Sequence, residues 1–108
     1  MSETFGITER SLEIVISAVA RFPEVECALV FGSRAMGNYK PGSDIDLALM
    51  GSAVGVDTAR RLSVILNEEE PIPYKVDVVA YSACESEELR RHIDQWGRPL
   101  AQASSVKK

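Results

Sequence analysis

A chain of 108 residues with 45% hydrophobic and 26% charged side chains has the composition of one globular domain, and it is too short for a second substrate-binding domain. Its net charge of -4 argues against a general nucleic-acid binder, because such proteins carry basic faces that neutralise phosphates. No apolar run approaches about 18 residues and the N-terminus lacks a secretory pattern. We therefore expect a cytoplasmic protein without a membrane segment.

The first predicted elements are a helix over residues 9–22 and a strand over residues 24–31. Apolar side chains recur at helical spacing from Leu12 to Phe22, and Thr8 is placed to cap the first turn. Pro23 cannot continue the helix. The strand that follows is rich in Val, Leu and Ala, so we expect the helix to cover a sheet with its apolar side.

Turn residues between positions 37 and 43 predict a loop, and a strand over residues 44–50 follows it. Side chains two apart on a strand share a face, so Asp44 and Asp46 project together while the intervening apolar residues face the core. Two adjacent carboxylates repel unless a cation lies between them, and no Lys or Arg occurs from residue 42 to residue 51. Magnesium accepts hard oxygen ligands and often shares them with substrate phosphates, so this pair predicts a magnesium site.

The turn at Gly32 and Ser33 would supply the phosphate side of that site. Glycine lets backbone N–H groups approach an anion closely, and a helix that starts there favours negative charge. Ser33 adds a hydroxyl donor, and Arg34 either binds phosphate through its planar fork or is ordinary surface charge. Together with the two aspartates, the turn indicates a nucleotide-plus-metal site; the alternative is a solvated turn with two exposed acids.

A third carboxylate lies within a later strand. A helix is predicted over residues 58–69, and the β-branched run from 74 to 81 predicts a strand with a lone acid, Asp77, at its centre. A carboxylate buried in such a run costs free energy unless it is paired or has a functional role. Asp77 faces the cleft of Asp44 and Asp46 if the two strands are neighbours; otherwise it is an edge-strand acid that discourages aggregation.

The last predicted element is a helix over residues 84–96, with a capping box formed by Ser82 and Glu85 at its start and Gly97 at its end. The single histidine, His92, lies on this helix and is interpreted as a surface residue. We expect residues 101–108 to be disordered. Alternating strands and helices place the domain in the α/β or α+β class.

The motif residues resemble those of the nucleotidyltransferase superfamily that includes DNA polymerase beta. That superfamily carries Gly-Ser, a loop of similar length to residues 34–43, then Asp-x-Asp and a third Asp on a later strand; here these are Gly32-Ser33, Asp44, Asp46 and the candidate Asp77. The resemblance covers residues 25–100. It implies a small mixed β-sheet with helices packed on one side, in a single domain over residues 1–100. It also implies two Mg²⁺ ions held by the three aspartates, with Gly32, Ser33 and Arg34 orienting the phosphates of ATP.

Within that superfamily, the small size and the Gly-Ser-Arg-Ala-x-Gly sequence of residues 32–37 look most like the minimal nucleotidyltransferases (MNT), the antitoxin partners of HEPN ribonuclease toxins. The resemblance implies an antitoxin that transfers AMP from ATP to a tyrosine hydroxyl of a HEPN toxin. The net charge and the lack of a long apolar run separately predict no direct nucleic-acid or membrane partner. Two alternatives stay open. One is an inactive nucleotide-binding subunit that inhibits its partner by occlusion, and the other is an antibiotic-modifying nucleotidyltransferase.

Overall fold

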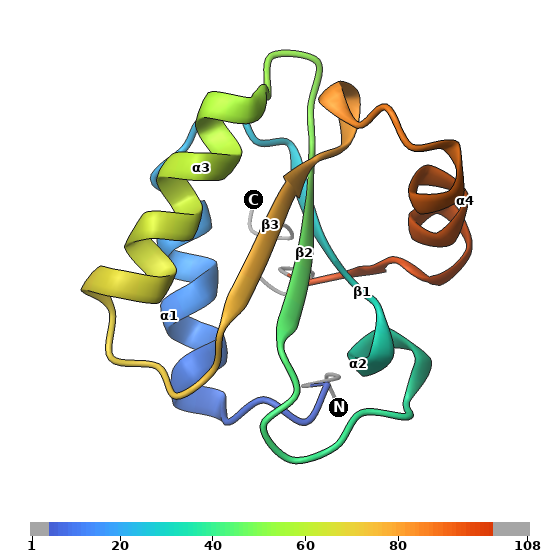
Figure 1. Cartoon of the computed structure of the whole chain (residues 1–108). Helices are drawn as coiled ribbons and strands as arrows, with labels where there is room; N and C mark the ends of the chain where they lie inside the picture. The colour runs from blue at the N-terminus through green and yellow to red at the C-terminus, as the bar shows by residue number, and fades with distance from the viewer. Residues whose placement is uncertain (1–4, 101–108) are drawn as a thin grey trace.

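A computed structural model describes residues 5–100, and these residues form one mixed sheet with helices on both faces (Figure 1). The strand order is β3-β2-β1-β4, with β1 antiparallel to both of its neighbours and β2 parallel to β3. In chain order the elements are α1 Glu9–Val19, β1 Cys27–Phe31, α2 Ser33–Met36, β2 Ile45–Met50, α3 Val56–Val64, a π-helical turn Ile65–Glu69, β3 Val76–Ala80, a 3-10 turn Tyr81–Ala83, α4 Glu87–Trp96 and β4 Arg98–Pro99. The predicted α/β class and mixed sheet are confirmed.

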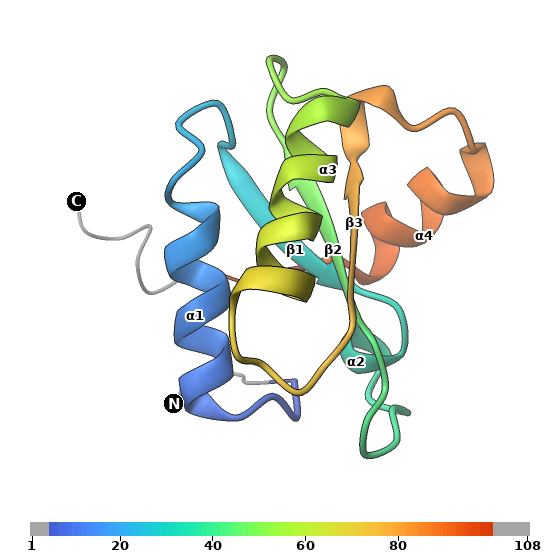
Figure 2. The same ribbon diagram turned by 60° about the vertical axis from the view of Figure 1, so that its left-hand side comes forward.

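Helices α1 and α3 cover one face of the sheet, and α4 lies against the other (Figures 1 and 2). Successive side chains of β2 point to opposite faces of the sheet, so this strand contributes to the packing on both sides. Ile45, Leu47 and Leu49 enter the larger core beneath α1 and α3, while Ala48 joins Phe31 and Ile93 in a smaller core beneath α4. The prediction of helices on one side therefore holds for α1 and α3 but not for α4.

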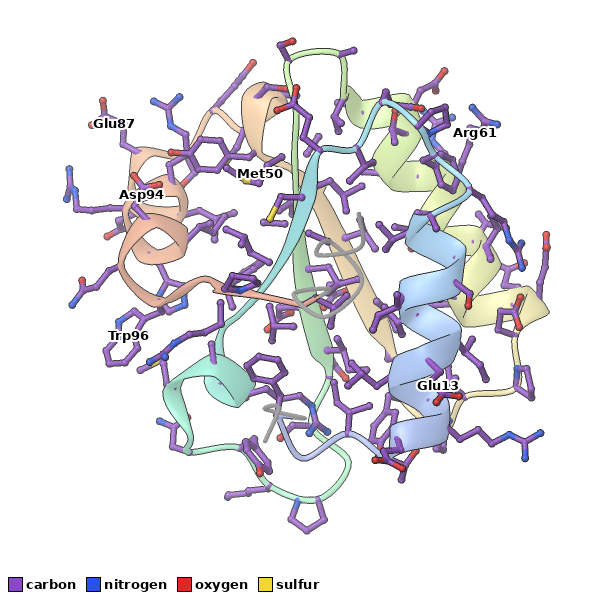
Figure 3. All side chains as sticks on the ribbon, turned by 180° about the vertical axis from the view of Figure 1, so that it is seen from behind. Glu13, Met50, Arg61, Glu87, Asp94 and Trp96 are labelled. Atoms are coloured by element: carbon purple, nitrogen blue, oxygen red, sulfur yellow. The ribbon has the colours of Figure 1, made fainter. Side chains whose placement is uncertain are left out.

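The charged side chains labelled on α1, α3 and α4 point away from these two cores (Figure 3). Glu13 on α1, Arg61 on α3, and Glu87 and Asp94 on α4 are all exposed. No helix within residues 5–100 is long and apolar enough to cross a membrane. The predicted tail at residues 101–108 lies outside the described residues.

The N-terminal helix begins with the expected cap, whereas the C-terminal helix ends at the expected Gly97 but begins with a different cap. The backbone N–H of Ser11 donates to Thr8 Oγ1 at 3.2 Å, which confirms Thr8 as the cap. Helix α4, however, begins at Glu87, with Ser86 Oγ accepting the Leu89 N–H at 3.1 Å. Ser82 instead donates its hydroxyl to the Val54 carbonyl at 2.6 Å. The predicted capping box was wrong because a tertiary contact uses the Ser82 hydroxyl.

One side chain holds the beginning of the edge strand β3. Asn67, in the π-helical turn, donates Nδ2 to the Val76 carbonyl and accepts the Val76 N–H on Oδ1, both at 2.8 Å. Its Nδ2 also donates to the Ser63 carbonyl at 2.9 Å. The amide therefore pairs with Val76 as a neighbouring strand would, and Val76 directly precedes Asp77.

Replacing Asn67 with alanine is expected to destabilise the protein by about 1–3 kcal/mol, because two backbone groups of Val76 lose their partners. Urea unfolding followed by circular dichroism measures this change. The matched control is Asn38→Ala, since Asn38 is exposed in a loop and its loss should cost less than about 0.5 kcal/mol. Equal stability of the two variants would show that Asn67 does not hold the strand.

Candidate active site

The sheet register places two of the predicted aspartates opposite each other. Asp46 on β2 is the direct partner of Asp77 on the parallel strand β3, and it is also opposite Phe31 at the end of β1. Asp44 lies two residues before Asp46, just ahead of the strand. The strands that carry the acids are therefore neighbours, as a shared cleft requires, and Asp46 is central among them.

The carboxylates act on one another electrostatically. Burial raises the pKa of Asp46 above its usual value, and the negative charges of Asp77 and Asp44 raise this pKa further. The positive charge of the nearby Arg34 opposes that change. Asp46 is half-buried, and this burial is the main reason for its raised pKa.

A metal ion would need ligands from outside the chain to complete its coordination. Among the residues that the structure describes, no three His, Cys, Asp or Glu side chains gather closely enough to form a metal site alone. The available donors are carboxylate oxygens, which fit Mg²⁺, and Mg²⁺ usually keeps waters and takes substrate phosphate oxygens. The donor chemistry thus fits magnesium bound together with a nucleotide.

Gly32 is packed directly against Asp46. Its backbone has φ 76° and ψ −155°, a region that is essentially restricted to glycine. A Cβ atom added at Gly32 would collide with Asp46 Oδ2. Glycine is therefore required at the turn both by the backbone conformation and by the close approach of the carboxylate. The same residue is the N-cap of the short helix α2, which begins at Ser33.

The variant Gly32→Ala is expected to cost more stability than Gly37→Ala, by about 1–3 kcal/mol. Gly37 also has a positive φ, 86°, but its ψ of 5° lies in the left-handed helical region that other residues can adopt, and a Cβ there would meet nothing within 4 Å. It is therefore the control for a glycine that is neither in a glycine-only conformation nor sterically enclosed. Chemical denaturation of both variants gives the comparison. Similar losses in the two would contradict the requirement for glycine at position 32.

Arg34 is buried, with only 3% of its surface exposed, and its guanidinium holds the loop before Asp44. Nε and Nη2 donate to the Ser43 carbonyl at 3.2 and 2.7 Å, and Nη1 donates to the Phe5 carbonyl at 2.9 Å. The group also lies over the rings of Tyr39 and Tyr74, at 5.1 and 4.9 Å from their centroids. This geometry favours a structural role for Arg34 over the phosphate contact, which stays an untested prediction.

His92 is a residue of this region that the sequence interpretation missed. The Gly32 N–H donates to His92 Nε2 at 3.1 Å, and the imidazole stands edge-on to Phe31, with ring centroids 5.9 Å apart. His92 is half-buried rather than a surface residue. The available signal was its position on α4, three residues after Leu89 and next to Ile93, on the side that packs against the sheet.

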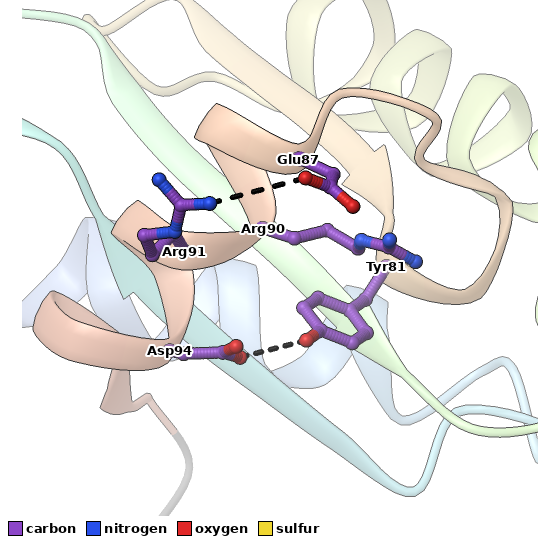
Figure 4. A pocket seen from close by; sticks show the side chains of 5 residues that line it. All are labelled: Tyr81, Glu87, Arg90, Arg91 and Asp94. Carbon is purple, nitrogen blue, oxygen red and sulfur yellow. Dashed lines mark hydrogen bonds and ion pairs between the residues drawn. The ribbon is translucent and has the colours of Figure 1, made fainter.

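An open pocket of about 280 Å³ lies on α4, and it contains none of the predicted site residues (Figure 4). It is lined by Tyr81, Glu87, Arg90, Arg91 and Asp94. The Tyr81 hydroxyl donates to Asp94 Oδ1 at 2.7 Å, and this bond raises the pKa of the phenol. Two further lining residues, Arg91 and Glu87, form an exposed ion pair at 3.9 Å.

Solved structures of low sequence identity share this fold. A chain of a toxin–antitoxin crystal structure with AMP-PNP aligns at 21% identity and a TM-score of 0.69, covering 88% of this chain and 78% of that chain. A chain of the tri-AMPylated Shewanella oneidensis HEPN toxin in complex with MNT antitoxin aligns at 19% identity and a TM-score of 0.64, covering 90% and 76%. An MntA–HepT toxin–antitoxin structure gives 19% identity and a TM-score of 0.65, with the same coverage.

The fold and the paired carboxylates define a nucleotidyltransferase domain, and a family comparison agrees. The profile described as "Polymerase beta, Nucleotidyltransferase" matches residues 13–105. The chain therefore belongs to the polymerase beta nucleotidyltransferase family, which confirms the superfamily resemblance of its motif. No curated protein matches the chain.

Proposed function

We propose that this chain transfers AMP from ATP to a hydroxyl group in a magnesium-dependent reaction. The observation that carries the proposal is the facing pair of Asp46 and Asp77, with Gly32 packed against Asp46. A cluster of negative charge next to a glycine turn fits the binding of cations and a polyphosphate better than it fits a structural role. The proposed substrate is ATP.

In the proposed reaction, Asp44 and Asp46 hold Mg²⁺, and Asp77 completes a second magnesium site. Magnesium held by these carboxylates would supply the positive charge that stabilises the attacking and leaving oxygens. Gly32 forms the tight turn beside Asp46, and Ser33 orients the β and γ phosphates through its backbone N–H and its hydroxyl. The acceptor oxygen loses its proton to the Asp77 carboxylate and bonds to the α-phosphorus, while the bond from that phosphorus to the bridging oxygen breaks and pyrophosphate leaves.

We further propose that the acceptor is a tyrosine hydroxyl on a HEPN toxin, so that this chain is its antitoxin. Support comes from the structural neighbours, which include a toxin–antitoxin structure with AMP-PNP and an AMPylated HEPN toxin in complex with its MNT antitoxin. In this proposal the acceptor hydroxyl arrives on another protein. Positioning by the complex would then supply the orientation that the small domain cannot provide alone.

Intact-mass spectrometry of a co-expressed HEPN toxin, incubated with ATP and magnesium, tests this function. A mass gain of one or more AMP units with the parent chain, and none with Asp44→Ala/Asp46→Ala, is the expected result. A stable complex without any mass gain would favour inhibition by occlusion. Transfer of labelled AMP to hydroxylated antibiotics, and not to the toxin, would instead favour the small-molecule activity.

A further inference from the structure

We propose that His92 is a positioning residue for the nucleotide-binding turn, which it holds by accepting the Gly32 N–H. This inference rests on the proposed function, because the turn matters for ATP only if the chain binds it. The main evidence is a hydrogen bond of 3.1 Å from Gly32 N to His92 Nε2, which joins residues 60 positions apart in the chain.

The placement of His92 follows from the packing of α4. Ile93 is 1% exposed and packs with Phe31 and Ala48 in the smaller core, which fixes the rotation of the helix over the sheet. The residue before it, His92, is then directed toward the end of β1. Its ring stands at 74° to the Phe31 ring, an edge-to-face arrangement that fixes the imidazole plane. Two contacts therefore orient the ring before any ligand binds.

The hydrogen bond assigns a role to one ring nitrogen. An imidazole nitrogen that accepts an N–H must carry no proton, so Nε2 is the acceptor and Nδ1 carries the proton of the neutral ring. The donor is the residue at which an added Cβ would collide with Asp46 Oδ2. His92 therefore ties α4 to a turn residue that is packed close to the central carboxylate.

The consequence concerns the geometry of ATP binding rather than the chemical step. Gly32 adopts a conformation that is restricted to glycine, and such a residue has many alternative conformations when it is not held. By fixing Gly32, His92 sets the position of Ser33 relative to Asp46 and Asp77. A loss of this bond should weaken ATP binding and leave the rate at saturating ATP little changed.

Two variants separate positioning from packing. His92→Gln retains an acceptor, because the amide oxygen can take the Gly32 N–H, whereas His92→Leu retains apolar contact with Phe31 and removes the acceptor. We expect His92→Leu to raise the KM for ATP by about five- to tenfold, the typical effect of one neutral hydrogen bond. His92→Gln should stay within about twofold of the parent, and kcat should change less than about twofold in both. The matched control is Gln95→Leu, at an exposed position of the same helix.

A second measurement makes the inference independent of catalysis. The Gly32 amide in a ¹⁵N–¹H spectrum should exchange with solvent slowly in the parent and His92→Gln, and faster in His92→Leu. Equal exchange in all three would overturn the inference, as would an unchanged KM in His92→Leu. If the parent binds no ATP, the proposed function is wrong, and the positioning role of His92 for ATP is wrong as well. Slow exchange of the Gly32 amide would in that case demonstrate only the hydrogen bond to His92.

Discussion

Asp46→Asn is expected to reduce AMP transfer by about a hundredfold or more. An amide at this position cannot supply the charge that holds magnesium, and metal ions contribute several kcal/mol to charge stabilisation in the transition state of such reactions. Each 1.36 kcal/mol corresponds to about a tenfold change in rate. Single-turnover transfer of labelled AMP, measured at saturating ATP and magnesium, gives the change in the chemical step directly.

The same substitution should stabilise the metal-free protein at neutral pH. Burial and the charges of Asp77 and Asp44 raise the pKa of Asp46 in the folded state. As the pH rises, the unfolded chain therefore loses this proton first, and ionisation favours unfolding. The free-energy cost of ionising Asp46 in the folded protein is absent below the unfolded-state pKa of this side chain, and it is complete above its folded-state pKa. The asparagine side chain carries no charge, so the gain in stability should be present at pH 7 and vanish at about pH 3.

Urea unfolding at both pH values, in the presence of a chelator, measures this difference. The matched control is Asp57→Asn, because Asp57 is 83% exposed on its side chain and pairs with Arg60 only at 3.6 Å. That variant should retain transfer activity and show no comparable stabilisation. A variant at position 46 that transfers AMP at the parental rate would exclude this carboxylate from catalysis, and lower stability at pH 7 would contradict the electrostatic argument.

Arg34→Leu should produce a large loss of stability, about 3 kcal/mol or more. The substitution removes three hydrogen bonds and leaves the carbonyls of Ser43 and Phe5 without those donors in a buried environment. An unsatisfied buried group costs about 1–3 kcal/mol, and bonds from a charged donor lie at the upper end of that range. The stacking of Arg34 on Tyr39 and Tyr74 is also lost.

Denaturant midpoints and slopes for three variants test this role. Arg34→Lys keeps the charge but not the planar fork, so it should recover only part of the loss. Arg60→Leu is the control on the exposed surface, where the side chain is 69% exposed, and it should change stability by less than about 0.5 kcal/mol. Parental stability of Arg34→Leu, together with weaker ATP binding, would instead restore the phosphate contact suggested by the sequence.

Much of the fold could be predicted because its determinants are local. The apolar period of α1, the Thr8 cap and the turn chemistry at residues 37–43 depend on near neighbours in the chain. The strands that carry Asp46 and Asp77 were predicted for the same reason. The start of α4 and its cap were misplaced, since Ser82 makes a tertiary bond that outweighs its helix-capping preference.

In the candidate site, as in the fold, some features depend on local sequence and others on long-range pairing. Spacing alone was enough to predict a nucleotide-plus-metal site at Asp44, Asp46 and the Gly32 turn, because these groups are close together in the sequence and a strand projects alternate residues to one face. The register that sets Asp77 opposite Asp46 required the pairing of β2 with β3. That pairing is a long-range choice, and strand period does not specify which strands are neighbours.

Arg34 and His92 show what only the tertiary structure decided. Both were interpreted as exposed or ligand-facing groups, yet Arg34 is buried against the carbonyls of Ser43 and Phe5, and His92 accepts the Gly32 N–H. Their partners are 9 to 60 residues distant in the chain. A polar side chain takes its role from whichever donors or acceptors the folded chain brings to it, so sequence specified the groups and packing specified their partners.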